Sequence, residues 1–486
     1  MGKGNALPTF IFHLSSLIFS PYFPTMKEHL FSDKAFYQKL IHLTLPIAFQ
    51  SLMLASVAAC DALMLGRVEQ NAMAAVSLAT QIQFVQNMFL YSITSAASVL
   101  GAQYWGKGDK DAINKILCMS LRVCGALGLA VFLGCELAPT ALMRLFAHDE
   151  MLIAIGAGYL RIAGWSYLLT GISQCYLAVM KVTDHASRSA WISSGAVVLN
   201  ALLNGVFIFG LLGLPAMGAN GAALATLLAR VVELAWAVVS SYGKTFLHPK
   251  LAYLFRRDKQ LSADFRKILL PLLGGAGFWG IGFTSYTAVM GHMGPDAAAA
   301  NSVAAVVRDL MCCLTNGVSA AGGIMVGNEL GAGDLQKGKR YGDKVSKLSV
   351  LIGFFSTAVV LAVTWPVTRF IKLTDGARGY LVGMMVIMAF YMIGRAINTV
   401  VINGVFAAGG DTLFDMYSLA VFMWGVAIPL TVLGAFVFHW PVALVYACTC
   451  LDEVGKLPWV YAHYKKYKWV KDLTRESESK KLKVES

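Results

Sequence analysis

Twelve apolar stretches, each long enough to cross a lipid bilayer, follow one another between residues 40 and 462. A bilayer core of roughly 30 Å needs about 20 apolar residues of helix at about 1.5 Å per residue. The pattern therefore predicts an all-α polytopic membrane protein with twelve transmembrane helices. The expected spans lie near residues 40–65, 74–100, 115–138, 153–180, 188–212, 218–242, 267–291, 298–326, 345–370, 380–407, 413–437 and 441–462.

Composition agrees with a membrane protein, because 57% of the residues are hydrophobic and only 14% are charged. The formal net charge of +13 could suggest a nucleic-acid partner, but the basic residues lie in loops and in the tail. We expect them to face anionic lipid on the cytoplasmic side, with no nucleic acid bound. Because the number of spans is even, we expect both termini on the cytoplasmic side. We expect the protein itself in the cytoplasmic (inner) cell membrane.

The second half of the chain repeats the first, at an offset of 225 positions through the first two spans of each half and at 227 and 223 further on. The offset of 225 pairs Pro46 with Pro271, and it lays GAQYWGKGD (101–109) over VGNELGAGD (326–334). Two six-helix lobes related by duplication, both with the same orientation, are therefore predicted. Lobes of this kind form a central site and alternate its access, which favours a transporter over a channel or an enzyme.

The repeat and the basic loops predict five regions. They are an N-terminal segment (1–35), an N-lobe with helices 1–6 (36–243), a cytoplasmic inter-lobe loop (244–265), a C-lobe with helices 7–12 (266–463) and a basic cytoplasmic tail (464–486). Residues 1–25 hold a short apolar patch broken by prolines, so we expect no signal peptide there. Nine scattered cysteines without metal spacing predict neither disulfides nor a metal site.

Asp61 is a carboxylate within an apolar run. Inserting an acid into the membrane costs free energy, so such a residue is by default a candidate for function. It lies 15 residues past Pro46, roughly 22 Å deep at the rise of a helix. Asn200 and Asn204, one turn apart on helix 5, reach a similar depth, and Thr226 on helix 6 lies roughly 12 Å below the outer surface.

An acid, two amides and a hydroxyl could thus surround one point in the outer half of the N-lobe. Such oxygens suit H⁺ or Na⁺, and a carboxyl neutralised on one side of the membrane and released on the other can couple transport to a cation gradient. The alternative is that the two amides only bridge helices and that Asp61 reaches interfacial water.

The C-lobe carries its own polar residues within apolar runs. Arg308 and Asp309 on helix 8 and Arg395 on helix 10 could line a cavity, and aromatic residues such as Trp279 could form walls for an apolar cation. Packing against lipid is the alternative for the aromatic residues. Arg230 and Glu233, three residues apart on helix 6, are expected to form a local pair or to snorkel.

Several motifs together resemble the multidrug and toxic compound extrusion (MATE) family. They are the paired LP openings, CDALMLG on helix 1, GAQYWGKGD after helix 2, VLNALLNGVFIFG on helix 5 and GANGAALAT before helix 6. The resemblance implies the MATE fold and a cation-coupled antiporter that exports organic, often cationic, drugs, with no cofactor besides the coupling ion. It also places Asp61 at the family's helix 1 acid, Asn200 and Thr226 in its first-lobe network, and Pro46 at a helix 1 proline whose bending is linked to protonation.

The chain departs from the family pattern at three positions. Asn204 stands where one branch has an aspartate, Trp279 where NorM-like and eukaryotic members have a glutamate, and Ala396, beside Arg395, where some have an aspartate. Asp61 is therefore the expected coupling acid, with cation binding in the C-lobe left open. We expect a monomer that contacts small organic substrates and membrane lipids.

Two other classes of function were considered. A lipid-linked oligosaccharide flippase would need a strongly cationic central cavity, for which only Arg308 and Arg395 are candidates. An intramembrane enzyme would need a nucleophile and base or a metal constellation, and the sequence contains no HExxH, GxSxG or cysteine–histidine set.

Overall fold

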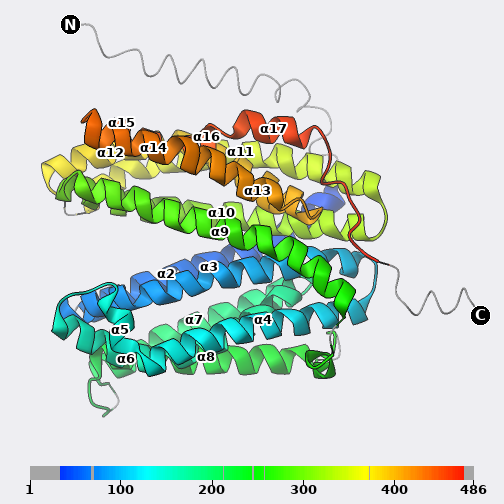
Figure 1. The fold of residues 1–486 in the computed structure, drawn as a ribbon, viewed down its shortest axis with the longest axis horizontal. Helices are drawn as coiled ribbons and strands as arrows, with labels where there is room; N and C mark the ends of the chain where they lie inside the picture. Colours follow the sequence, from blue (N-terminus) through cyan, green and yellow to red (C-terminus); the bar gives the residue numbers. More distant parts are fainter. Residues whose placement is uncertain are drawn as a thin grey trace, which may run out of the picture.

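Helices account for all regular structure in the described part of the chain (Figure 1). The computed structural model describes residues 33–66, 70–211, 213–243, 246–256, 258–371 and 373–475. Our expectation about a signal peptide in residues 1–25 lies outside these ranges, as does the end of the predicted tail.

The N-lobe is built from six long helices and one short one. They are α2 (Lys34–Gly66), α3 (Gln70–Gly106), α4 (Lys110–Leu137), α5 (Pro139–Arg144), α6 (Glu150–Val182), α7 (Ala186–Phe209) and α8 (Gly218–Ser241). Their boundaries follow local chemistry. Asp109 accepts a hydrogen bond from the backbone of Ala112 (3.0 Å) at the start of α4, and Gly210 ends α7 with a φ of 72°, which glycine adopts without strain.

The C-lobe begins after a short 3₁₀ turn, η1 (Leu251–Leu254). It contains α9 (Lys259–His292), α10 (Pro295–Gly331), α11 (Leu335–Phe370) and α12 (Asp375–Asn398), which continues as the π-helix η2 (Thr399–Phe406). One further span is assembled from α13 (Leu413–Leu419), η3 (Ala420–Ala427), α14 (Ile428–Val432) and η4 (Leu433–Val437), and the last from α15 (Val442–Thr449), α16 (Leu451–Val454) and α17 (Leu457–Tyr464).

Ten described stretches are long and apolar enough to cross a membrane. The two other predicted spans are helical as well: 74–100 lies in α3, and 441–462 is divided among α15, α16 and α17. The inter-lobe loop is shorter than predicted, because α9 begins at Lys259 although we expected the loop to reach residue 265. Asp258 caps this helix by accepting a hydrogen bond from the N–H of Leu261 (3.1 Å).

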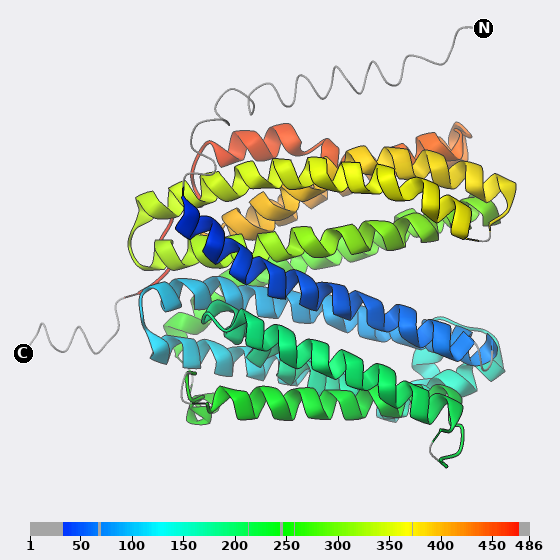
Figure 2. The same cartoon turned by 180° about the vertical axis from the view of Figure 1, so that it is seen from behind.

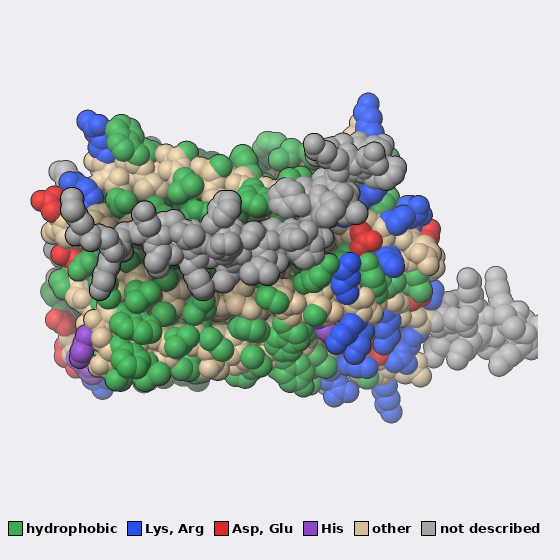
Figure 3. All heavy atoms as spheres, turned by 90° about the horizontal axis from the view of Figure 1, so that it is seen from above, with side chains coloured by type: hydrophobic (Ala, Val, Ile, Leu, Met, Phe, Trp, Pro, Cys, Tyr) green, Lys and Arg blue, Asp and Glu red, His purple; other side chains and the backbone are tan. Residues whose placement is uncertain are grey.

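The two halves form two layers of roughly parallel helices (Figures 1 and 2). Helices α2, α3, α9 and α10 lie at the interface, where α10 packs against α2 and α3, and α3 packs against α9. The layers approach each other at the right of Figure 1. On the face shown in Figure 3, Lys and Arg side chains gather at this same end, which we call the basic end, and apolar side chains cover the middle.

Pseudo-twofold symmetry relates the contacts between the lobes near the basic end. Ala102 of α3 faces Gly327 of α10, and a Cβ on Gly327 would lie 2.9 Å from that of Ala102. These two residues are themselves 225 positions apart, so the symmetry axis passes between them. Gly106 and Gly331, also 225 apart, each lie against the backbone of the opposite helix. The repeat read from the sequence is thus present as spatial symmetry.

The chain crosses both lobes again after α17. We call residues 469–475 the tail strap. Trp469 is fully buried in the C-lobe core, and the side chain of Gln103 on α3 makes hydrogen bonds of 2.6 and 3.1 Å to the backbone of the strap. Arg475 ends the strap in an ion pair with Asp264 of α9 (2.6 Å). The strap therefore joins the lobes at the basic end.

Candidate functional site

Helices α2, α7 and α8 bring Asp61, Asn200, Asn204 and Thr226 together inside the N-lobe. The side-chain amide of Asn204 donates to Asp61 Oδ1 at 2.5 Å and lies 3.4 Å from Asn200 Oδ1. The amide of Asn200 donates to the hydroxyl of Thr226 at 3.1 Å. The four side chains thus form one connected chain of hydrogen bonds from α2 through α7 to α8.

Helix geometry explains why these side chains meet. Asn200 and Asn204 are four residues apart on α7, so they lie on one face, and α7 packs against both α2 and α8. Small residues allow that approach: a Cβ on Gly221 of α8 would come within 2.6 Å of the carbonyl oxygen of Phe207. Asn200 and Asn204 are 5% and 0% exposed, and unpaired amides at that burial would be costly.

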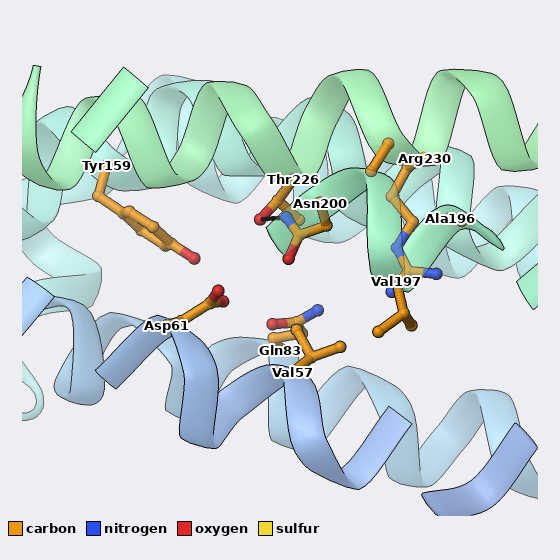
Figure 4. A pocket seen from close by; sticks show the side chains of 10 residues that line it. Val57, Asp61, Gln83, Tyr159, Ala196, Val197, Asn200, Thr226 and Arg230 are labelled. Carbon is orange, nitrogen blue, oxygen red and sulfur yellow. Dashed lines mark hydrogen bonds between the residues drawn. The ribbon is translucent and has the colours of Figure 1, made fainter. Parts of the chain in front are cut away.

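A small cavity of about 30 Å³ opens beside Asp61 (Figure 4). A cavity needs at least about 10–15 Å³ on this measure to hold one water molecule. The space therefore suits water or a small cation and excludes an organic substrate. Its walls are Val57, Asp61, Gln83, Tyr159, Ala196, Val197, Asn200, Thr226, Ala229 and Arg230.

Three polar residues of this wall were not singled out for this site from the sequence. Figure 4 shows the hydroxyl of Tyr159 on α6 pointing toward Asp61 and the amide of Gln83 on α3 lying across from Asn200. Both are uncharged residue types, common in membrane helices, and nothing in their spacing distinguishes them. Arg230 approaches from the other side of the cavity.

Arg230 forms the local pair that its spacing predicts. Its guanidinium lies 2.7 Å from Glu233 Oε2, and Ser173 on α6 donates to the same oxygen at 3.0 Å. Glu233 is 0% exposed, so the pair does not snorkel to the surface. Glu233 neutralises the charge of Arg230. Arg230 therefore lines the cavity while it is paired with Glu233 and not with Asp61.

The arrangement can hold one neutralising cation. Asp61 supplies a carboxylate, while Asn200, Gln83 and Thr226 supply further oxygens around the cavity. Within the described ranges, no group of three or more His, Cys, Asp or Glu side chains could hold a metal ion. Pro46 lies within α2, which continues through it, and its missing N–H leaves one helical hydrogen bond unmade.

A second, larger cavity of about 250 Å³ lies inside the C-lobe. Trp279, Arg308, Asp309 and Arg395, the four residues predicted for a C-lobe cavity, all lie in its wall. The other wall residues are Phe283, Tyr286, Thr287, Met290, Asn301, Ala305, Cys312, Asn316, Tyr391, Met423, Tyr446, Thr449, Cys450 and Asp452.

Both arginines of this cavity are paired with carboxylates. Arg308 donates to Asp309 at 2.8 Å and lies over the ring of Phe283, 4.6 Å from its centre. Arg395 donates to Glu453 of α16 at 2.6 Å. Asp452 and Glu453 were not singled out from the sequence, although they lie at the middle of the last predicted span (441–462).

A membrane-embedded bundle of two symmetry-related lobes, with a buried polar cavity in each, defines a multi-pass membrane transporter. The MatE family model matches the chain twice, over residues 46–206 and 271–433, and the two matches begin 225 positions apart. They cover more than half of the chain, which therefore belongs to the MatE family of multidrug and toxic compound extrusion (MATE) efflux transporters.

Similarity to individual proteins extends over most of the chain. The "Uncharacterized transporter YisQ" of Bacillus subtilis is 23% identical over 90% of this chain and 96% of its own length. A "Probable multidrug resistance protein NorM" of Bradyrhizobium diazoefficiens is 26% identical over 82% and 86%. Among solved structures, a mutant of the Vibrio cholerae MATE transporter VcmN superimposes with a TM-score of 0.82 at 16% identity, covering 90% of this chain and 98% of that chain, which confirms the predicted fold.

Proposed function

We propose that the protein is a cation-coupled antiporter that exports organic, cationic or amphipathic compounds across the cytoplasmic membrane by alternating access. The coupling cation is H⁺ or Na⁺, and it binds at Asp61. Asn200, Asn204 and Thr226 adjust its affinity, and Pro46 allows helix α2 to bend as the site changes its access. No cofactor takes part besides this cation.

The observation that carries the proposal is the enclosure of Asp61. A single carboxylate faces a cavity of water or ion size, and a buried amide donates to it at 2.5 Å. An acid inside a membrane protein is costly when ionised and unpaired. Its neutralisation by a cation therefore changes which arrangement of the lobes is favoured.

Two arguments support an organic substrate. Relatives of this chain are named as probable multidrug resistance proteins, and the C-lobe cavity is lined by aromatic side chains that suit apolar cations. Each cavity is formed within one chain, which fits a monomer. We propose no partners other than small organic molecules and membrane lipids, and no nucleic acid.

The distribution of charge supports the proposed orientation. The basic end carries Lys107 before α4, Lys110 as its first residue, Lys337 and Arg340 at the start of α11, and the tail lysines Lys465, Lys466 and Lys468. Positive residues in short loops mark the cytoplasmic side. The basic end therefore faces the cytoplasm, and both termini lie there.

A flippase for lipid-linked oligosaccharides is the less favoured function. Such a protein would need free positive charge in its cavity, whereas Arg308 and Arg395 are each bound to a carboxylate.

Liposomes containing purified protein test the proposal directly. An imposed pH gradient, or a Na⁺ gradient applied alone, should drive efflux of a fluorescent organic cation by the wild type. Asp61→Asn should abolish this gradient-driven efflux while the protein remains inserted and monodisperse. Asp375→Asn is the matched control, because Asp375 is fully exposed at the start of α12.

Full gradient-driven efflux by a correctly inserted Asp61→Asn protein would remove Asp61 from the mechanism. If neither gradient drove efflux by the wild type, cation coupling itself would be wrong.

A further inference from the structure

The C-lobe contains a cluster of charges that does not balance. Glu453 lies between two cations, with Arg395 at 2.6 Å from one oxygen and Lys456 at 2.9 Å from the other. Asp452 stands next to Glu453, and Asp415 of α13 interacts electrostatically with both cations. Three acids therefore face two bases. Since isolated charge in a membrane interior is costly, this cluster has room for one more positive charge.

Asp452 is the acid of this cluster that has a carboxylate oxygen without a hydrogen-bond donor among the described residues. The residue is only 7% exposed, it lies in the wall of the C-lobe cavity, and its Oδ1 has no hydrogen-bond partner in the described part of the chain. The neighbouring Glu453 takes the donors instead: besides Arg395 and Lys456, the amide of Asn398 donates to it at 2.7 Å. A buried acceptor without a donor calls for a physical explanation, and a bound cation in the adjoining cavity supplies one.

The walls of the cavity define the chemistry of that ligand. Trp279, Phe283, Tyr286, Tyr391 and Tyr446 present aromatic side chains to the space. Aromatic faces around an acid recognise ammonium groups, above all quaternary ones. An anion would find no free partner here, because both arginines in the wall already bind carboxylates.

The helix around Asp452 is irregular, although Cys450 and Gly455 keep right-handed helical dihedral angles. Helix α16 is a separate four-residue segment between turns at Cys450 and at Gly455, and the π-helix η3 packs against it. An irregular helix and a carboxylate oxygen without a donor therefore coincide at one wall of the cavity.

Size separates this cavity from the one at Asp61. Drug-sized ligands occupy roughly 300–1,000 Å³, so the C-lobe cavity of about 250 Å³ accepts a small organic head group. The N-lobe cavity of about 30 Å³ does not.

We propose that Asp452 and the aromatic walls around it form a binding site for the ammonium head group of an organic cation. The inference rests on the proposed export function and assigns its substrate to the C-lobe, while the coupling cation remains at Asp61. Binding forms an ion pair between the ammonium and the Asp452 carboxylate. It requires no covalent step.

Tetraethylammonium is a suitable probe, because its charge is permanent and its size matches the cavity. Equilibrium binding to purified full-length protein in lipid nanodiscs should weaken at least tenfold in Asp452→Asn and recover in part in Asp452→Glu. Asp375→Asn is the control for an acid outside the cavity.

A wall variant keeps the proposal testable if Asp452→Asn does not fold. Trp279→Leu should weaken binding about five- to thirtyfold, the size expected for loss of a desolvated cation–π contact. Trp165→Leu should leave it unchanged, because Trp165 is a half-exposed residue of α6 and lies outside this cavity.

Unchanged binding in folded Asp452→Asn, or in Trp279→Leu, overturns the site. Loss of binding in Asp61→Asn but not in Asp452→Asn places the substrate in the N-lobe and also overturns it. Failure of the export function is distinguishable, since a wild type without gradient-driven efflux would still bind tetraethylammonium through Asp452.

Discussion

Gly106 of α3 lies directly against the backbone carbonyl of Asn328 on α10, and a Cβ at Gly106 would overlap that oxygen. The repeat supplies a second copy of the same contact, because Gly331 lies against the carbonyl of Gln103 in the same way. In both pairs only glycine fits. The lobes are therefore held at the basic end by two equivalent backbone contacts, which an added methyl group would force apart.

Gly106→Ala and Gly331→Ala should each shift the protein toward a state open at the basic end. Overpacking of this kind costs about 1–3 kcal/mol. The added methyl group raises the free energy of the closed arrangement, in which the helices touch, and not that of an opened one. Spin labels at Lys110 and Gln336, exposed residues of opposite lobes, should report longer distances in both variants. Gly125→Ala is the control, since space around Gly125 is open. Equal distances in all variants would contradict the prediction.

Replacing Asn204 with leucine should slow gradient-driven efflux. The amide donates to Asp61 at 2.5 Å, and a hydrogen bond to a charged group contributes about 1.5–3 kcal/mol. Its loss destabilises the ionised carboxylate, so release of the coupling cation becomes slower by roughly ten- to a hundredfold. Efflux rates at saturating substrate measure the effect. Asn71→Leu, at an exposed amide of α3, should retain the wild-type rate.

Glu233→Gln should destabilise the protein strongly. Removing one partner of a buried ion pair leaves an uncompensated charge, at a cost of about 3–5 kcal/mol. Arg230 would then face the Asp61 cavity without its counter-charge, so coupled efflux should fall as well. Thermal unfolding in detergent tests the first effect. Glu150→Gln breaks an exposed pair with Arg144 (3.4 Å) and should change stability by at most about 1 kcal/mol. Similar melting curves for the two variants would argue against a structural role for Glu233.

Trp469→Ala should detach the tail strap. The indole is 0% exposed and packs against Gly342 of α11, and truncation of a large buried side chain costs about 3–5 kcal/mol. Proteolysis near residue 470 should become rapid in the variant and stay slow in the wild type. Trp191→Ala, at a residue 70% exposed, provides the comparison. A protease-resistant Trp469→Ala tail would show that the hydrogen bonds to α3 hold the strap without the indole.

The meeting of Asp61, Asn200 and Asn204 could be predicted from the sequence, because helix geometry alone decides it. Asn200 and Asn204 are four residues apart, so they share a face of α7 whatever the packing, and counting the helical rise places Asp61 at a similar depth. The contribution of α6 was not predictable in this way. Tyr159 reaches Asp61 only because of how α6 packs in the bundle, and one of 18 tyrosines carries no distinguishing signal.

The C-lobe cavity also contains contacts that could not be predicted from the sequence. Arg308 and Arg395 stood out because charges are rare in apolar runs, and both lie in the cavity. The pairing of Arg395 was not predictable, because Glu453 meets it across 58 residues of chain. Asp452 matters only because its neighbour Glu453 takes those donors, which is a property of the folded cluster.

The tail strap also has a consequence for how the protein is made. Membrane proteins are synthesised from the N-terminus, and domains fold largely in that order. The hydrogen bonds between Gln103 and the strap join a helix made early to residues made after every span. These hydrogen bonds therefore form only after translation has passed residue 475, and until then the interface of α2, α3, α9 and α10 lacks them.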